Sequence, residues 1–149
     1  MDKEEKFLVR DYWAADYPHV ADIWERTGMS TPGRGDTAEV IENTLRRKGR
    51  LLVLVDKESD TVIGTSWMTN DGRRLYLHHF AVDPGFQGRG LSKKLLRESL
   101  KIAKETGLQV KLEVHHHNRR AISLYKNAGF QRLGDYDVYI IRDMGEIKE

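Results

Sequence analysis

The chain has 149 residues, of which 39% are apolar and 32% charged, and it contains no cysteine, so disulfides, thiolate metal sites and a cysteine nucleophile are excluded. This length and composition predict one soluble globular domain over residues 1–149. The net charge of +2 does not favour a nucleic-acid partner, and no apolar run approaches the ~20 residues of a membrane span, so we expect a cytoplasmic protein that binds neither nucleic acid nor membrane.

Two helices are expected in the first third of the chain. Residues 14–27 carry apolar side chains at helical spacing. Asp36 and Glu39 have the spacing of a capping box, so a second helix is predicted over residues 36–48. The loop of residues 28–36, rich in glycine and polar residues, joins the two helices.

Several strands are expected around and after these helices. The run Leu51–Val55 is almost continuously apolar, which is typical of a strand buried on both faces. Asn70-Asp71-Gly72 is a strong hairpin signal between two further strands. The strands predicted in this half span residues 7–10, 51–55, 61–68 and 74–82.

A glycine-rich turn follows the last of these strands. Pro84 cannot donate to a sheet ladder, so the strand ends just before it. Gly85, Gly88 and Gly90 allow the backbone to bend sharply and to approach a ligand closely. The long amphipathic helix expected at residues 90–106 begins with unpaired N–H groups and the positive end of its dipole. Together these features predict a cradle for a phosphate or pyrophosphate.

The last third of the chain completes the predicted fold. Residues 109–114 alternate like a strand, residues 119–128 have a helical pattern, and residues 130–133 and 136–142 indicate a closing hairpin. We therefore expect an α/β (α+β) domain whose twisted, mixed and mostly antiparallel sheet has about seven strands and about four flanking helices.

Two motifs resemble the GNAT superfamily of N-acetyltransferases. The segment from Gln87 to Ser92 is similar to the family's acetyl-CoA pyrophosphate motif, Q/R-x-x-G-x-G/A, with Ser92 where the family usually has Gly or Ala. The segment from Asn118 to Phe130 is similar to the family pattern N-x-x-A-x-x-L-Y-x-x-x-G-F. The spacing and order of the elements match over nearly the whole chain. The resemblance implies an acetyl-CoA-dependent N-acetyltransferase, and it also allows a homodimer.

The resemblance further implies where acetyl-CoA, as co-substrate, would bind. The strands ending at Val82 and Val114 would splay into a V-shaped slot, and pantetheine would pair with the main chain there as an added strand does. The pyrophosphate would rest on the glycine turn, and Asn118 would bind the cofactor or fix the slot wall. The implied binding residues are Phe80, Ala81, Val82, Gln87, Gly88, Arg89, Gly90, Leu91, Ser92, Asn118 and Tyr125.

The same resemblance implies catalytic residues. Tyr125 lies where the family often has the general acid that protonates the CoA thiolate, although an amphipathic tyrosine of the core is the other interpretation. Glu113 matches a strand carboxylate that serves as base in relatives resembling ribosomal-protein N-terminal acetyltransferases, and a surface ion pair with Lys111 is its alternative. His78 matches a histidine proton relay of arylalkylamine-type members, and strand alternation would send His78 and His79 to opposite sides. The choice between Glu113 and His78 stays open.

No metal is expected. His115, His116 and His117 are adjacent, but neighbouring residues on an extended chain point in opposite directions, and no carboxylate pattern completes a ligand set.

The expected reaction is direct attack of a primary amine on the thioester in a ternary complex, which needs no acyl carrier and so fits a chain without cysteine. Glu113 with Tyr125 favours a peptide or protein N-terminus as acceptor, with a small-molecule amine as the next choice. The loop at residues 28–36, the second helix and the closing hairpin are expected to contact it. A non-catalytic acyl-CoA-binding sensor module is the alternative function.

Overall fold

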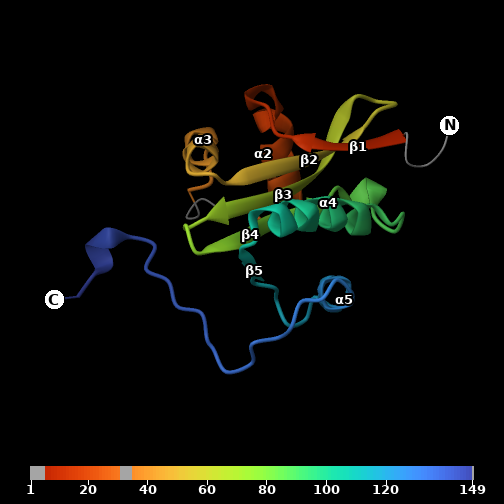
Figure 1. Cartoon of the computed structure of the whole chain (residues 1–149). Coiled ribbons are helices and arrows are strands. Elements are labelled where there is room, and N and C mark those ends of the chain that lie inside the picture. Colours follow the sequence, from red (N-terminus) through yellow and green to blue (C-terminus); the bar gives the residue numbers. More distant parts are fainter. Residues whose placement is uncertain (1–5, 31–34, 149) are drawn as a thin grey trace.

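The computed structural model describes residues 6–30 and 35–148, and a five-stranded sheet forms its centre (Figure 1). β1 to β4 are antiparallel to their neighbours, and β5 joins β4 in parallel. In chain order, which is also their order across the sheet, the strands are β1 (Phe7–Asp11), β2 (Arg50–Asp56), β3 (Thr61–Asn70), β4 (Arg74–Val82) and β5 (Gln109–Leu112). The α/β class and the mixed, mostly antiparallel sheet are confirmed.

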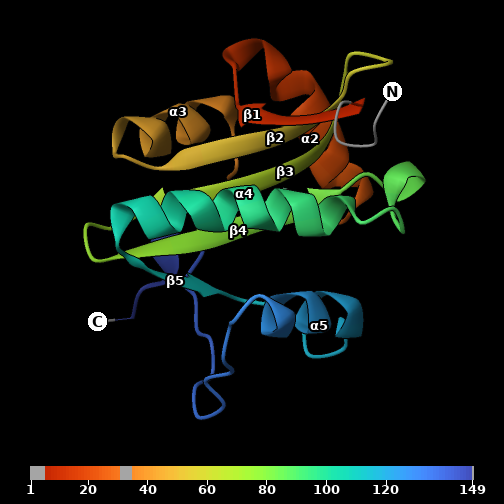
Figure 2. The same cartoon turned by 45° about the vertical axis from the view of Figure 1, so that its right-hand side comes forward.

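The described residues form four α-helices, as expected, of which α2 and α3 cover one face of the sheet, α4 covers the other, and α5 lies outside the sheet beyond β5 (Figure 2). One apolar core lies under α2 and α3, where Trp24 stacks on Trp67 of β3 with ring centroids 5.5 Å apart. The other lies under α4, which buries Leu95 and Leu96 completely or nearly so. The helices are α2 (Tyr17–Arg26), α3 (Ala38–Arg46), α4 (Leu91–Thr106) and α5 (Arg119–Asn127).

The strand β2 shows why the apolar run in the sequence is continuous. Leu51 and Val53 face the core under α2 and α3, whereas Leu52 and Leu54 face the core under α4. Both faces are covered, so alternation between apolar and polar side chains is absent, and the predicted doubly buried strand is confirmed.

Two local predictions need correction. The cap of α3 is Thr37, whose Oγ1 accepts a hydrogen bond from the Val40 N–H at 3.2 Å, and not Asp36. Asp36 instead pairs with His79 of β4, the His79 Nε2 to Asp36 Oδ2 distance being 2.9 Å. This long-range partner draws the carboxylate away from the helix end, which a local capping pattern does not reveal.

The predicted closing hairpin is also wrong, because no strand forms at residues 130–133 or 136–142, and the sheet therefore has five strands instead of seven. After α5 the chain runs out beyond β5 without regular structure except for a short 3-10 turn at Met144–Glu146 (Figure 1). Among the residues that the structure describes, no helix is long and apolar enough to cross a membrane.

Candidate active site

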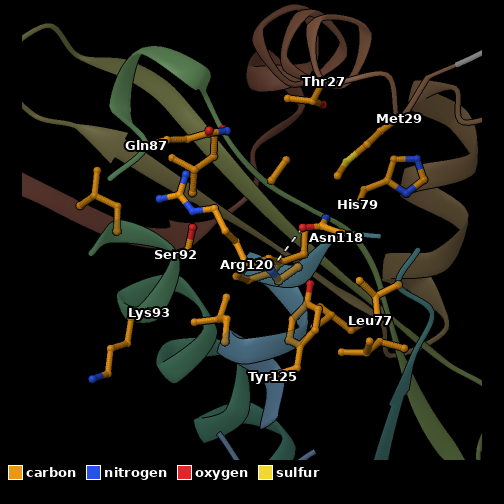
Figure 3. A pocket seen from close by; sticks show the side chains of 18 of the residues that line it. Thr27, Met29, Leu77, His79, Gln87, Ser92, Lys93, Asn118, Arg120 and Tyr125 are labelled. Carbon is orange, nitrogen blue, oxygen red and sulfur yellow. Dashed lines mark hydrogen bonds between the residues drawn. The ribbon is translucent and has the colours of Figure 1, made fainter. Parts of the chain in front are cut away.

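The divergence of β4 and β5 opens a cleft of about 770 Å³ (Figure 3). Their pairing ends at Leu77 and Leu112, whereas β4 continues through His78 to Val82 with β3 as its strand neighbour on the other edge. The walls come from the end of β4, the glycine turn, the start of α4, the chain after β5, and α5. The expected V-shaped slot is thereby confirmed.

A bulge in β4 turns two histidines toward the same cleft. The register between β3 and β4 shifts near Trp67, and His79 has a φ of 44°, in the left-handed region that a non-glycine residue seldom adopts. The rings of His78 and His79 lie 6.0 and 5.4 Å from that of Trp67, and both residues line the cleft. The prediction that alternation sends them to opposite sides is therefore wrong, because the bulge interrupts the alternation.

Buried hydrogen bonds hold this bulge in place. Thr65 is fully buried, and its hydroxyl donates to the carbonyl oxygen of His79 at 2.7 Å. The indole N–H of Trp24 in turn donates to the Thr65 Oγ1 at 2.9 Å. Strained backbone persists where its surroundings over-determine it, and here α2, β3 and β4 all contribute to the constraint.

The glycine turn is attached to the body at both ends. Asp83 accepts a hydrogen bond from the Gly85 N–H at 2.9 Å and another from the Arg26 Nη2 of α2 at 2.6 Å. The hydrogen bond from Arg26 lowers the pKa of Asp83 below its usual value. The Gln87 Nε2 donates to the Val82 carbonyl at 3.0 Å, which closes the turn.

Two glycines give this turn the shape of a ligand cradle. Gly88 and Gly90 have φ angles of 79° and 76°, and a Cβ built on either would have no atom within 4 Å. Gly90 is the N-cap of α4 and provides no side chain to cap it, so the helix start faces open space with its partial positive charge. An anionic group such as the pyrophosphate of acetyl-CoA fits this space.

The cradle residues do not all face the same hollow. Gln87, Gly88, Gly90, Leu91 and Ser92 line the cleft, as do the β4 residues Phe80, Ala81 and Val82. Arg89 lines a neighbouring hollow instead, and its guanidinium lies 5.2 Å from the centre of the Phe86 ring. Arg89 is thus the one predicted binding residue that the structure places outside the cleft.

Tyr125 of α5 directs its hydroxyl into the middle of the cleft (Figure 3). Its ring packs edge-on against Phe80 and Phe130, with centroids 5.9 and 5.6 Å away, so the side chain is 8% exposed. Burial raises the pKa of Tyr125 to about 12. No hydrogen bond to this hydroxyl occurs within the described residues, and the raised pKa keeps it protonated, so it can donate to a ligand.

Asn118 and Arg120 enter the cleft from the start of α5. The Asn118 Oδ1 caps the helix by accepting from the Ala121 N–H at 3.2 Å, which leaves its amide nitrogen on the cleft side. The Arg120 side chain extends toward Gln87 across the cleft (Figure 3). The sequence analysis did not predict Arg120 as a site residue. Its position on the first turn of α5, two residues after the capping Asn118, would have indicated that it lies near the cleft.

The two candidate bases lie near each other on the wall formed by β4 and the end of β5. The Tyr76 hydroxyl donates to the Glu113 Oε1 at 2.5 Å, and the Tyr76 ring stacks on His78 with centroids 4.5 Å apart. The His78 Nε2 lies 2.9 Å from the Thr69 Oγ1. Burial, and then the nearby His79, lower the pKa of His78, so its ring is neutral at pH 7. The alternative ion pair between Glu113 and Lys111 does not form in the described structure.

The three consecutive histidines form an exposed turn at the mouth of the cleft. Their ring centroids lie 5.0 to 5.4 Å apart, and the His117 N–H donates to the His115 Nδ1 at 3.3 Å. No group of three or more metal-ligating side chains occurs in the described residues. Thr27 and Met29 also line the cleft, from the end of α2, and the predicted acceptor loop continues into residues 31–34, which lie outside the described residues.

Comparison with known proteins agrees with this geometry. The family model described as "Acetyltransferase (GNAT) family" matches residues 9–130. The chain belongs to this family. Over 82 residues it is 39% identical to the N-alpha-acetyltransferase RimI of Mycobacterium tuberculosis, which covers 52% of this chain and 51% of that relative. It is also 36% identical over 69 residues to the thialysine N-epsilon-acetyltransferase of Bos taurus, covering 46% of this chain and 41% of the relative. The GNAT chain thus spans about half the length of the curated relatives it matches.

Solved structures share the fold at low sequence identity. An acetyltransferase from Streptococcus agalactiae superposes with a TM-score of 0.75 at 20% identity, covering 92% of both chains. A predicted acetyltransferase from Clostridium acetobutylicum, solved with acetyl-CoA, has a TM-score of 0.72 at 18% identity, covering 90% of this chain and 96% of that one. These likenesses show that the GNAT chain has the fold of acetyltransferases.

Proposed function

We propose that this GNAT chain is an N-acetyltransferase that moves the acetyl group of acetyl-CoA to a primary amine by direct attack. One observation carries the proposal: a single cleft joins the glycine cradle to the hydroxyl of Tyr125 and to two candidate bases. The cradle suits the pyrophosphate, and the free edge of β4 at Phe80–Val82 suits the pantetheine arm. The thioester of acetyl-CoA supplies an activated acetyl group.

Each proposed catalytic role is assigned to a named group in the cleft. His78 or Glu113 takes the proton that leaves the amine, directly or through water. The main-chain N–H groups near Phe80–Val82 polarise the carbonyl, and Tyr125 donates its hydroxyl proton toward the departing sulfur. Holding both reactants in one cleft contributes much of the rate, because the attack becomes effectively intramolecular. The chain has no cysteine to carry the acetyl group, which supports direct transfer.

A peptide or protein N-terminus is the acceptor that we favour. The likeness to RimI, named an N-alpha-acetyltransferase, supports it, as does Glu113 at the cleft wall. An α-amine has a pKa near ~8, so a neutral fraction exists at physiological pH and a weak base suffices. A small-molecule amine is the second candidate, supported by the likeness to the thialysine N-epsilon-acetyltransferase.

Release of CoA thiol in the presence of three acceptor probes tests the proposal. We expect release with a peptide that has a free alanine N-terminus, and none with the same peptide after N-acetylation. Turnover of thialysine in place of the peptide would assign the second acceptor class. Binding of acetyl-CoA without thiol release for any probe would support the non-catalytic sensor and contradict the enzyme. We also propose that the protein is a homodimer.

A further inference from the structure

One nearly buried polar pair beside the cleft takes no part in the transfer steps proposed above. The His79 Nε2 of β4 lies 2.9 Å from the Asp36 Oδ2, and the two side chains are only 10 and 14% exposed. An ionised carboxylate can only accept a hydrogen bond, so the His79 Nε2 carries a hydrogen and donates it to Asp36. A hydrogen bond to a charged group in so enclosed a place is strong, and loss of either partner would leave the other unpaired.

The main chain at His79 is held from a second direction. His79 has a φ of 44°, and His79 and Phe80 together stand opposite a single residue of β3, Ser66, as in a β-bulge. The Thr65 hydroxyl donates to the His79 carbonyl at 2.7 Å. Strained backbone of this kind persists only where several contacts fix it. Thr65 fixes the carbonyl from β3, and Asp36 fixes the side chain from the segment that leads into α3.

Two buried indoles confine the His79 ring, but their N–H groups are engaged elsewhere. The ring centroids of Trp24 and Trp67 lie 4.4 and 5.4 Å from that of His79. The Trp24 N–H donates to Thr65, and the Trp67 N–H donates to Thr44. The indoles therefore limit where the imidazole can lie, whereas Asp36 supplies the hydrogen bond that sets its direction at Nε2.

We propose that Asp36 is a positioning residue for the transfer reaction and acts through His79 on the bulge of β4. The inference rests on the proposed function, in which main-chain N–H groups near Phe80–Val82 polarise the thioester carbonyl. His79 lines the cleft and directly precedes this stretch, whereas Asp36 is not among the described residues that line it (Figure 3). Rotation of the imidazole away from Asp36 would release the strained peptide unit that sets the direction of the Phe80 N–H.

Substitutions at Asp36 test this role against a matched control. Asp36→Ala should lower kcat roughly 10- to 100-fold, because misplacement of a reacting group by about 1 Å can cost on the order of 100-fold. Asp36→Asn should restore most of the rate, since its amide oxygen can still accept from the His79 Nε2. Asp16→Ala is the control, because the Asp16 side chain is 9% exposed and pairs with Arg10 at 2.8 Å in the 3-10 turn before α2.

All variants are assayed at a temperature at which they are folded, with the amine that the natural chain turns over. Asp16→Ala should then leave kcat unchanged, and equal losses of kcat in Asp16→Ala and Asp36→Ala would overturn the proposal. A double-mutant cycle tests whether Asp36 acts through His79. Adding Asp36→Ala to His79→Ala should lower kcat no further, whereas losses that multiply would also overturn it.

NMR adds a readout that needs no substrate. In ¹H–¹⁵N spectra of the imidazoles, the His79 Nε2–H signal should be present in the natural chain and in Asp36→Asn and absent in Asp36→Ala. Turnover by the natural chain together with an unchanged signal in Asp36→Ala would overturn the positioning role alone. A natural chain that shows the signal but turns over no amine would instead overturn the proposed function, and the positioning role with it.

Discussion

Tyr125→Phe removes one oxygen atom from the cleft and leaves the packing of the ring in place. Phe80 and Phe130 contact the ring edge-on and are unaffected by the change. The hydroxyl has no hydrogen-bond partner among the described residues, so its loss orphans no buried group. We therefore expect the free energy of unfolding to change by less than about 1 kcal/mol.

Turnover should respond much more strongly than stability. A hydrogen bond to a charged group, here the developing thiolate, contributes about 1.5–3 kcal/mol. Since each ~1.4 kcal/mol is a factor of ten, kcat should fall roughly 10- to 150-fold, with little change in the KM for acetyl-CoA. Because burial raises the pKa of Tyr125 to about 12, the hydroxyl stays protonated at every pH at which a rate is conveniently measured.

The release of CoA can be measured with a chromogenic thiol reagent. Because the chain has no cysteine, the protein itself does not react with this reagent. Tyr12→Phe is the matched control, since Tyr12 is 7% exposed but lies in the core under α2 and α3, away from the cleft. Its kcat should equal that of the natural chain. A Tyr125→Phe variant with an unchanged kcat would contradict the catalytic role of Tyr125 and would leave it as a residue of the core only.

Four further predictions concern the surroundings of the cleft. If His78 is the base, kcat at saturating acceptor should fall as the pH drops through the lowered pKa of His78, because a protonated imidazole accepts no proton. His78→Gln should remove this acid limb of kcat, and Glu113→Gln should keep it. The reverse result would assign the role of base to Glu113. The same lowered pKa makes the free energy of unfolding decrease as the pH falls below 6.5, because the unfolded chain binds the proton first. Thr65→Val should lower the free energy of unfolding, measured in urea, by about 1–3 kcal/mol, because it removes the hydroxyl that accepts from the buried Trp24 indole N–H and donates to the His79 carbonyl. An effect no larger than that of Thr61→Val, at a more exposed threonine of β3, would contradict this role. Arg26→Gln should raise the KM for acetyl-CoA severalfold by releasing Asp83 and the glycine turn, whereas Asp22→Asn, which removes the other partner of Arg26, should leave it unchanged.

The strands and the glycine turn were predictable because their signals are local. β4 has the predicted bounds, Arg74–Val82, since an Asn-Asp-Gly turn precedes it and Pro84 follows it. The helix α4 begins one residue later than predicted, because Gly90 takes the left-handed cap position and Leu91 is the first helical residue. Short-range rules of backbone geometry decide each of these features.

The features that were missed depend on contacts between distant parts of the chain. The bulge at His79 is supported by Thr65 and Trp24, and the pairing of Asp36 with His79 joins residues 43 positions apart. Alternation and capping patterns contain no information on such contacts. The predicted closing hairpin is wrong for a different reason: residues 136–142 have the pattern of a strand, but no strand of the described residues pairs with them. A strand-like sequence pattern indicates that a segment can pair with another strand, but it does not show which strand that would be.

Calorimetric titration with acetyl-CoA tests the central claim most directly, when the natural chain is compared with Gly90→Val and Gly107→Val. Both glycines have positive φ, 76° and 74°, and a Cβ on either meets no atom within 4 Å, so the two variants share the same backbone strain of at least ~1–2 kcal/mol. Gly90 lines the cleft, whereas Gly107 ends α4 and does not. We predict that the natural chain and Gly107→Val bind acetyl-CoA and that Gly90→Val does not. Equal binding by both variants, or no binding by the natural chain, would contradict it.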